Sequence, residues 1–477
     1  MTHSLQIKKN SIFALLSNIA RLLTNILILI GIARLYGPIS LGQFTTAQAF
    51  ATMFLLFADY GFDLLLVTEV ARQRTHKVHL ANRYLSLKII TAICSAFAMM
   101  LFGLTSSMDV QIKIMTVIFA FYVLCTSLQT LFFSLFKGLE QLNHETRILF
   151  VTNLIALLLL VIIGYSHAPI IYFAVLMVVT RVVGLIMVIC TATLLLGKHW
   201  FKFSLVGWRE IWKKVAVFGS YVILGVLYFQ MDTILLAFWK GDQAVGIYQS
   251  VFRIILLLLV IVDVGISVLM PALARYYSEG SKLWNQVGNL LYRTLFLIAL
   301  PITMILFVYA EQVIIILYGK DKFIEAVPIL RIFSLIGFIR FAAEPFGLML
   351  TTGQRQTTRM VIIAIAAITN LSLNMHFIPI DGPIGAAKVS LITNSMVAVL
   401  YIATTRPFLG SWLLDIATVV PFIVTIILSS ILWYFKNISL WYIGIPAIMI
   451  CLVVNYWFGY TSNERKMLFT FNTLNPL

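Results

Sequence analysis

Arginine residues lie deep inside long apolar segments of this chain, where an ionisable side chain costs ~2.5–3.5 kcal/mol on insertion scales and usually faces a cavity or a partner. Arg21 lies about ten residues into the first apolar segment, which is ~15 Å along a helix that rises 1.5 Å per residue. Asn18 and Asn25 lie three residues before it and four residues after it, on the same face of a helix. This polar stripe predicts the wall of a water-filled cavity. The alternative is an arginine that binds carbonyl groups between packed helices.

Arg253 and Asp232 form a second candidate pair, in two consecutive apolar segments. Arg253 lies about seven residues past Gly246, which is ~10 Å below the outer edge of its segment. Asp232 lies at nearly the same depth in the preceding, antiparallel segment. One interpretation is an ion pair that joins the two segments. The other is that Arg253 is shared between Asp232 and a substrate phosphate, because a guanidinium can bind phosphate through two parallel hydrogen bonds.

Two other segments carry charges near the midplane of a bilayer. Arg181 is a lone cation in the sixth apolar segment, and cavity lining and helix packing both remain open for it. Arg340 and Glu344 are spaced i, i+4 in the tenth segment, which favours a pair between them.

Polar residues also occur nearer the ends of segments. Lys388 and Arg293 are close enough to an end for a long side chain to reach the interface. Asn370 and Asn374 share one face of the eleventh segment, where hydrogen bonding between helices and cavity lining are equally open. The cations predicted to bind an anionic substrate are Arg21, Arg253, Arg181, Arg340 and Lys388, and the predicted neutral polar lining is Asn18, Asn25, Asn370 and Asn374.

The composition requires lipid as the solvent for most of the chain. Of its 477 residues 61% are hydrophobic and 11% are charged, whereas a soluble domain is about 25% charged. In lipid every backbone polar group must be bonded internally, so the fold class is predicted to be an all-α polytopic membrane protein. The first apolar run, from about Ser11, is too long for a signal-peptide core and lacks a small-residue cleavage site, so we expect a retained span.

About fourteen apolar runs approach or exceed the ~20 residues that cross a bilayer. They lie at roughly 11–35, 41–69, 84–107, 113–136, 148–165, 170–196, 215–239, 246–274, 290–310, 326–351, 359–379, 384–405, 412–434 and 440–460. The four cysteines lie inside these runs without metal-binding spacing, so we expect them to pack and predict no metal site. The stretch EQVIIILYGKDKFIE, from Glu311 to Glu325, is predicted to be a short interfacial helix and turn.

An internal repeat organises these spans. At one fixed offset (241 − 37 = 204) five positions match without a gap: Gly37 with Gly241, Gly42 with Gly246, Phe44 with Tyr248, Asp59 with Asp263, and Gly61 with Gly265. The offset equals six spans of about 34 residues. An even number of spans restores the orientation, so we predict two parallel six-helix lobes related by an axis along the membrane normal, followed by two additional helices.

Asp59 and Asp263 occupy matched positions about eighteen residues into their helices, near the predicted cytoplasmic edge. Gly61 and Gly265 follow closely, which favours a capping or hinge role over coupling to a proton. With Asp232 and Glu344, these two residues complete the set of acids considered for ion coupling or for pairing.

Basic residues are concentrated in alternate short connectors. About twenty lie on one predicted side and about six on the other, so both termini are predicted to be cytoplasmic. This orientation accounts for most of the net charge of +16, which in a soluble protein would suggest nucleic acid. The predicted parts are an N-terminal lobe (1–197), a basic cytoplasmic connector (198–214), a C-terminal lobe (215–405) and two further helices with a tail (406–477).

At the repeated stretches the chain resembles the Wzx-type flippases, which form the polysaccharide-export branch of the multidrug/oligosaccharidyl-lipid/polysaccharide superfamily. The similar stretches are LYGPISLGQF with ADYGFDLLLVTEVAR, QMDTILLAF with AVGIYQSVFRI and LMPALAR, AEQVIIILYGKDKFIEAVPILRI, and IPIDGPIGAAKVS at Ile378–Ser390. They cover most of residues 1–405 and form a pattern over many positions, which indicates a family more specifically than a substrate.

The resemblance implies two lobes around a central cavity that opens alternately to either membrane face. It implies transport of an undecaprenyl-pyrophosphate-linked O-antigen or related repeat unit from the cytoplasmic to the periplasmic leaflet of the bacterial inner membrane. Membrane lipid, a polysaccharide polymerase and a chain-length regulator are the expected partners. No cofactor is expected beyond coupling to a proton or sodium gradient, and no enzymatic reaction is expected.

Two other functions remain open. Drug extruders of the same superfamily usually carry a functional acid in the first span; this chain has Arg21 there and no acid, which argues against a cationic cargo. Membrane polysaccharide polymerases and ligases are similar in composition, but they carry a sizeable periplasmic loop with catalytic arginine and histidine. No predicted outward loop of this chain exceeds about twenty residues.

Overall fold

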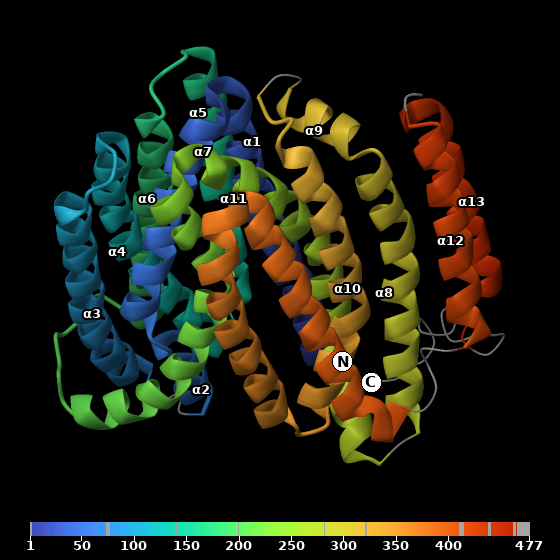
Figure 1. Cartoon of the computed structure of the whole chain (residues 1–477). Helices are drawn as coiled ribbons and strands as arrows, with labels where there is room; N and C mark the ends of the chain where they lie inside the picture. The colour runs from blue at the N-terminus through green and yellow to red at the C-terminus, as the bar shows by residue number, and fades with distance from the viewer. Residues whose placement is uncertain are drawn as a thin grey trace. The chain divides into compact units, whose positions relative to one another are not determined.

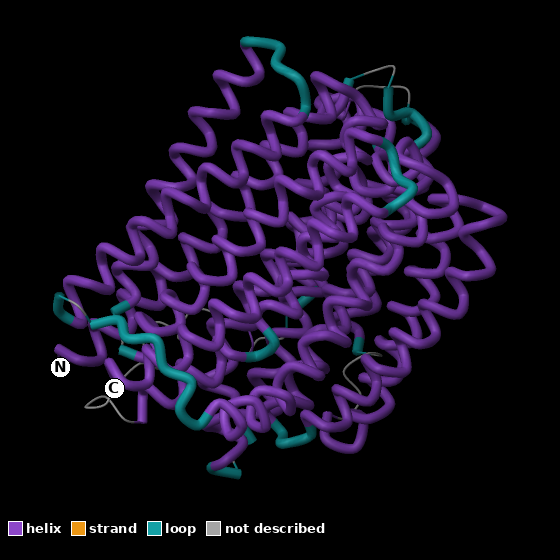
Figure 2. The backbone as a smooth tube through the Cα atoms, turned by 90° about the vertical axis from the view of Figure 1, so that its left-hand side faces the viewer, coloured by secondary structure: helices purple, strands orange, loops and turns teal. Residues whose placement is uncertain are grey.

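The computed structural model describes residues 2–72, 77–139, 141–198, 200–280, 282–319, 322–409, 415–436, 440–460 and 464. The described chain is helical throughout, with loops at the ends of the helices (Figure 2). The structure divides into two compact units, Met1–Gln249 and Ser250–Leu477. The predicted boundaries of the lobes remain predictions.

The first unit holds α1 (Thr2–Asp59), α2 (Phe62–Arg72), α3 (Lys77–Thr105), α4 (Val110–Gly138), α5 (Leu142–Tyr165), α6 (Ile171–Leu196) and the first part of α7 (Trp208–Ser278). Helix α4 packs against α1, α3 and α6, and α5 packs between α1 and α6 (Figure 1). A hydrophobic core joins α2, α3, α4, α6 and the start of α7 at one end of this unit.

The second unit holds the rest of α7, then α8 (Leu283–Val308), α9 (Ala310–Tyr318), α10 (Ala326–Thr352) and α11 (Gln356–Leu409). After them come α12 (Ile416–Tyr434), a π-helical turn (Leu440–Gly444) and α13 (Ile445–Phe458). Helix α10 packs against α8 and α11, and α12 packs against α8 and α13. The nine-residue α9 is the short helix that the sequence predicts for Glu311–Glu325.

Ten helices of the described chain are long and apolar enough to cross a membrane. Three of them, α1, α7 and α11, each cover two of the predicted spans and contain a break at Gly37, Gly241 and Gly382. The protein is therefore an all-α multi-pass membrane protein, as predicted, and the number of fourteen crossings remains a prediction.

The internal repeat is visible in the backbone. Gly37 has φ 85° and ψ −171°, and Gly241, at the matched position, has φ 76° and ψ −176°. Residues with a Cβ rarely adopt this conformation, which explains why both copies place glycine at the break. Pro38 follows the first break, where its fixed φ suits the first residue of the resumed helix.

The predicted span 41–69 is wrong at its far end. Helix α1 ends at Asp59, and α2 begins three residues later at Phe62. Gly61 has φ 85° and Tyr60 has φ 32°, and the latter is a strained value for a residue with a side chain. Apolar periodicity continues through this break, so the hydrophobic pattern alone does not reveal it.

Candidate functional site

Two of the predicted cavity cations meet in the first unit. Arg21 of α1 is exposed, and its electrostatic neighbours are Arg181 of α6, Tyr122 of α4 and Glu145 of α5. The guanidinium of Arg181 lies over the ring of Tyr122 at 5.4 Å from its centroid, a cation–π contact. Four helices thus bring two arginines and one acid into the same region. We call these four residues, together with Gln129, the arginine cluster.

The acid of the arginine cluster has its own partner, so it does not neutralise the arginines fully. The carboxylate of Glu145 lies 3.2 Å from the Lys137 ammonium. The buried Nε of Arg181 makes no hydrogen bond within the part of the chain that the structure describes. Two neighbouring guanidinium groups are suited to binding an anion.

Gln129 is a polar residue of this region that the sequence analysis missed. It lies on α4 two turns from Tyr122, and Gly184 of α6 leaves room for it, since a Cβ at Gly184 would lie 2.5 Å from its Nε2. Both polar atoms of the Gln129 amide are buried and make no hydrogen bond to any described residue. The sequence does contain a signal for this residue, because Gln129 is a lone glutamine among apolar residues and lies at helical spacing from Tyr122.

The two predicted asparagines beside Arg21 have different outcomes. Asn25 lies one turn further along α1 and is half-buried. Asn18 lies outside the residues whose side chains the structure describes. The predicted polar stripe is therefore described only at Arg21 and Asn25.

A buried ion cluster lies at the break between α1 and α2. The Lys88 ammonium of α3 is completely buried, 2.8 Å from an Asp59 oxygen and 3.1 Å from an Asp63 oxygen. The Ser127 hydroxyl of α4 donates a hydrogen bond of 2.7 Å to Asp59. Burial raises the pKa of the Asp63 carboxyl to about 6, and the neighbouring Asp59 adds to this, whereas Lys88 opposes it. Asp59, Asp63 and Lys88 are called the lysine cluster below.

Asp232 has a hydrogen-bond donor within the first unit. The Tyr248 hydroxyl donates to its carboxylate at 2.5 Å, between the parts of α7 on either side of the Gly241 break. Arg253, in the second unit, is half-buried and has Tyr318 of α9 as an electrostatic neighbour. The proposed Asp232–Arg253 pair and its alternative, a shared phosphate, remain predictions.

In the second unit the predicted Arg340–Glu344 contact is present at 3.4 Å. Arg359 of α11, which the sequence analysis did not consider, lies at the same distance from the other oxygen of Glu344. Asp263 is an electrostatic neighbour of both Arg340 and Glu344. These four residues form a mixed-charge group on α7, α10 and α11, so Glu344 and Asp263 partly neutralise Arg340 as a binding cation.

The other predicted residues of the second unit have local partners. The Lys388 side chain is half-exposed, and its ammonium lies 2.6 Å from a carboxylate oxygen of Asp381, just before the Gly382 break of the same helix. Asn374 donates to Asn370 at 2.9 Å, and both are buried.

The prediction for Arg293 is wrong. It does not reach the interface but is only 3% exposed, because it pairs with Asp415 and with Glu464, the latter at 2.9 Å.

The matched glycines lie where two backbone segments of the first unit approach each other closely. A Cβ at Gly42 would lie 1.8 Å from the backbone oxygen of Asp242, and a Cβ at Gly246 would lie 1.8 Å from that of Pro38. These two contacts exchange under the repeat (242 − 38 = 204 and 246 − 42 = 204), so they are related by the internal symmetry. Only glycine permits backbones to approach this closely.

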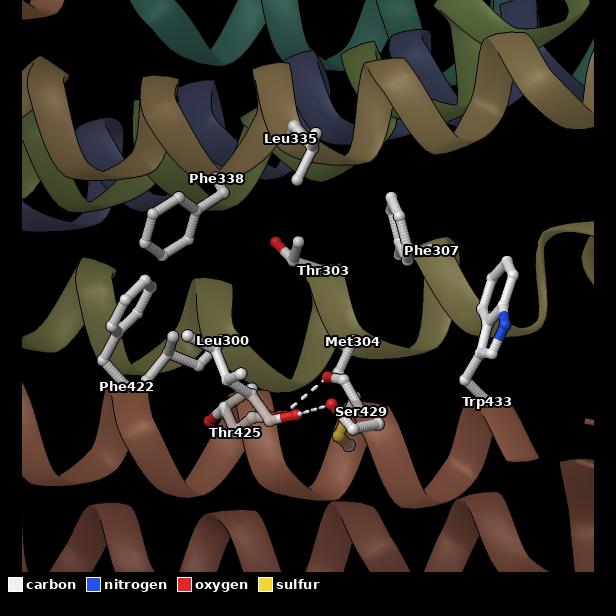
Figure 3. Close-up of a pocket in the computed structure, with 12 residues that line it drawn as sticks. Leu300, Thr303, Met304, Phe307, Leu335, Phe338, Phe422, Thr425, Ser429 and Trp433 are labelled. Carbon is white, nitrogen blue, oxygen red and sulfur yellow. Dashed lines mark hydrogen bonds between the residues drawn. The ribbon is translucent and has the colours of Figure 1, made fainter. Parts of the chain in front are cut away.

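The second unit contains an apolar cavity of about 570 Å³ between α8, α10 and α12 (Figure 3). Aromatic rings from all three helices line it, and Thr303 and Ser429 add hydroxyl groups. The Ser429 hydroxyl donates to the carbonyl oxygen of Thr425 at 2.7 Å, so it is already bonded within its own helix. The lining suits a large apolar group better than a polar one.

The described residues form a multi-pass membrane protein in which two arginines of the first unit are electrostatic neighbours. Residues 7–277, more than half of the chain, match the model of the polysaccharide biosynthesis protein family, and the chain belongs to this family. A membrane protein of Methanocaldococcus jannaschii, MJ1068, is 23% identical over 384 residues, which are 73% of this chain and 74% of that protein. Teichuronic acid biosynthesis protein TuaB of Bacillus subtilis is 27% identical over 157 residues, 32% of each chain.

Solved structures of transporters have the same fold. The lipid II flippase MurJ in an inward closed conformation has a TM-score of 0.74 at 15% identity and covers 97% of this chain and 100% of its own. An inward-facing multidrug resistance transporter of the MATE family has a TM-score of 0.66 at 14% identity and covers 81% of this chain and 94% of its own. The predicted polysaccharide family is confirmed by the family model, and the fold that the resemblance implies is confirmed by these structures.

Proposed function

We propose that this protein is a flippase that carries a pyrophosphate-linked oligosaccharide, borne on a polyprenyl lipid, from the inner to the outer leaflet of a cytoplasmic membrane. The arginine cluster is the observation that carries the proposal. Arg21 and Arg181 come from different helices and present guanidinium groups in one region, which is the chemistry that recognises a pyrophosphate. The family is one of polysaccharide biosynthesis, and MurJ, whose fold is similar, is a lipid II flippase.

Neutral polar groups beside the arginines are the proposed path for the sugars. The Gln129 amide is buried with both of its polar atoms available, and Asn25 lies one turn from Arg21. Sugar hydroxyl groups both donate and accept hydrogen bonds, as an amide does.

Transport by this route makes and breaks no covalent bond. It needs a binding site that opens to each side in turn, and a difference in affinity between the two states that gives direction. The glycine contacts at Gly42 and Gly246 are the proposed closed gate of one state. We place both termini in the cytoplasm, from the distribution of basic connectors.

Coupling to a proton gradient is part of the proposal, and the lysine cluster is the candidate for it. Two carboxylates share one ammonium, so the fully ionised cluster carries a net negative charge in a buried place. Binding one proton removes that unfavourable charge. A polymerase and a chain-length regulator are the proposed partners downstream.

A strain that lacks its own flippase tests the function. We expect the wild-type gene to restore export of polymer, and Arg21→Ala with Arg181→Ala to abolish it at normal membrane level. Arg406→Ala, at an exposed arginine near the end of α11, is the matched control and should export normally. Loss of export must come with accumulation of single lipid-linked repeat units. If the double variant exports fully, the arginine cluster is not the substrate site.

The same strain separates the flippase from a drug extruder. Two arginines repel an organic cation, so we expect no resistance to cationic dyes from overproduction of the protein. Dye resistance that depends on Arg21 would replace the flippase with an extruder.

A further inference from the structure

An extended segment between α6 and α7 is fixed to the first turns of α3. In this strap, residues 200–206, the Trp200 carbonyl accepts from the Asn82 amide at 3.0 Å, and the Lys202 N–H donates to Asn82 Oδ1 at 3.1 Å. The Ser204 N–H donates to the Ser86 hydroxyl at 2.8 Å. Side chains of α3 thus bond the backbone of an irregular segment at several points, which fixes its orientation.

The end of the strap is held in the same way. Arg83 donates from Nε to the Val206 carbonyl at 2.7 Å. The following residue, Gly207, has φ 72°, and a Cβ there would lie 2.0 Å from the Arg83 guanidinium. Glycine at this position is therefore needed for both the backbone conformation and the contact.

The fixed backbone directs most apolar side chains of the strap outward. Trp200 alone packs inward, 9% exposed and edge-on to Phe132. Phe203 and Val206 are 57% and 68% exposed, and Trp208, at the start of α7, is 47% exposed. Because the strap is held by hydrogen bonds to α3, these side chains are presented outward by the fold.

Cations alternate with these apolar side chains. Lys198, Lys202, Arg209 and Lys213 are all exposed, and Glu210 is the one acid in the sequence from 198 to 214. Arg209 lies over the Trp208 ring at 5.5 Å. Aromatic and aliphatic groups interleaved with cations, in a segment that does not span, are typical of a membrane surface and not of its interior.

We propose that residues 200–213, together with Lys198, form a binding surface for anionic phospholipid headgroups. The apolar side chains enter the acyl boundary, and the cations pair with headgroup phosphates at the same level. Each basic residue next to an anionic bilayer adds its own attraction to the lipid phosphates. The charge of the segment selects an anionic lipid over a neutral one. This binding is independent of the transported cargo, so the proposal stands apart from the proposed function.

The position of the strap relative to lipid can be measured directly on the full chain. The four cysteines are replaced by alanine, Phe203→Cys carries a nitroxide, and the protein is placed in nanodiscs of phosphatidylcholine with or without a quarter of phosphatidylglycerol. Oxygen concentrates in the acyl region and a nickel chelate in water, so power saturation reports depth. We expect the nitroxide to be oxygen-accessible and nickel-protected, and more so with phosphatidylglycerol. Val206→Cys provides a second position.

The cations supply the controlled comparison. Lys202→Gln with Arg209→Gln should remove the effect of phosphatidylglycerol, and native mass spectrometry should show affinity for that lipid lower by roughly fivefold per cation. Lys240→Gln with Lys322→Gln, exposed cations elsewhere in the chain, should leave both readouts unchanged. A nitroxide that is nickel-accessible in both lipids, or a lipid effect that survives Lys202→Gln with Arg209→Gln, overturns the proposal. The first of these results would show that the strap faces water and not lipid.

Discussion

Replacing Lys88 by methionine tests the lysine cluster most sharply. Methionine has a similar length and carries no charge, so Lys88→Met removes the ammonium and keeps most of the packing. The two carboxylates that it contacts, those of Asp59 and Asp63, then face each other without a cation. In this variant the Ser127 hydroxyl still donates a hydrogen bond to Asp59.

The expected loss follows from burial. Removing one partner from a buried ion pair costs about 3–5 kcal/mol, because the other charge stays buried and unpaired. Lys88 is completely buried, but the Asp59 and Asp63 side chains are 23% and 26% exposed, so water screens them in part. We therefore expect the lower end, a loss of about 3 kcal/mol in the free energy of unfolding.

The assay is equilibrium unfolding of the purified protein in mixed micelles. A triple variant, Lys88→Met with Asp59→Asn and Asp63→Asn, removes every charge of the cluster and should recover most of the loss. Lys240→Met, at an exposed lysine, should change the free energy by less than about 0.5 kcal/mol. If Lys88→Met is as stable as wild type, the cluster is not an ionised network. If the triple variant is no more stable than Lys88→Met, packing and not charge explains the loss.

Three further perturbations have defined outcomes. Burial raises the pKa of Asp63 to about 6, so the folded state binds its proton more tightly than the unfolded chain; this stabilisation is complete below pH ~4 and is lost as the pH rises through 6. Asp63→Asn should therefore flatten the melting temperature between pH 4 and 7, and an unchanged pH profile would assign the dependence to another group. Gly42→Ala places a Cβ 1.8 Å from a backbone oxygen, so it should lower the free energy of unfolding by about 1–3 kcal/mol in the same assay. The control is Gly164→Ala, whose Cβ meets only a side-chain methyl at 3.5 Å, and it should not lower the free energy of unfolding. Arg293→Gln breaks the pairs with Asp415 and Glu464, so amide hydrogen exchange should rise in α12 and α13; unchanged exchange there would show that the pairs do not hold these helices.

Much of the fold follows from the sequence because lipid allows few solutions. Long apolar runs must be helices, and matched glycines at an offset of 204 predict matched breaks, which Gly37 and Gly241 show in nearly equal backbone angles. The break at Tyr60 and Gly61 was not predicted, since the apolar pattern runs on through it.

The candidate site was predictable only in part. Arg21 and Arg181 are conspicuous because a cation in the middle of an apolar run needs an explanation. Lys88 and Arg293 were not, because each lies near enough to a predicted span end for a snorkelling side chain to explain it. Each is buried together with an acid from another part of the chain. Lys88 pairs with Asp63, and Arg293 pairs with Glu464. One-dimensional spacing does not contain such contacts.

Translocation by the purified protein tests the proposed function most directly. The protein is reconstituted in liposomes that carry a fluorescent disaccharide on a polyprenyl pyrophosphate in both leaflets, and a membrane-impermeant quencher reports crossing to the outer leaflet. We predict complete quenching over time with wild type and with Arg406→Ala, and a plateau near half, as in protein-free liposomes, with Arg21→Gln and Arg181→Gln combined. A plateau near half with folded wild type, or complete quenching with the double variant, would contradict transport through the arginine cluster.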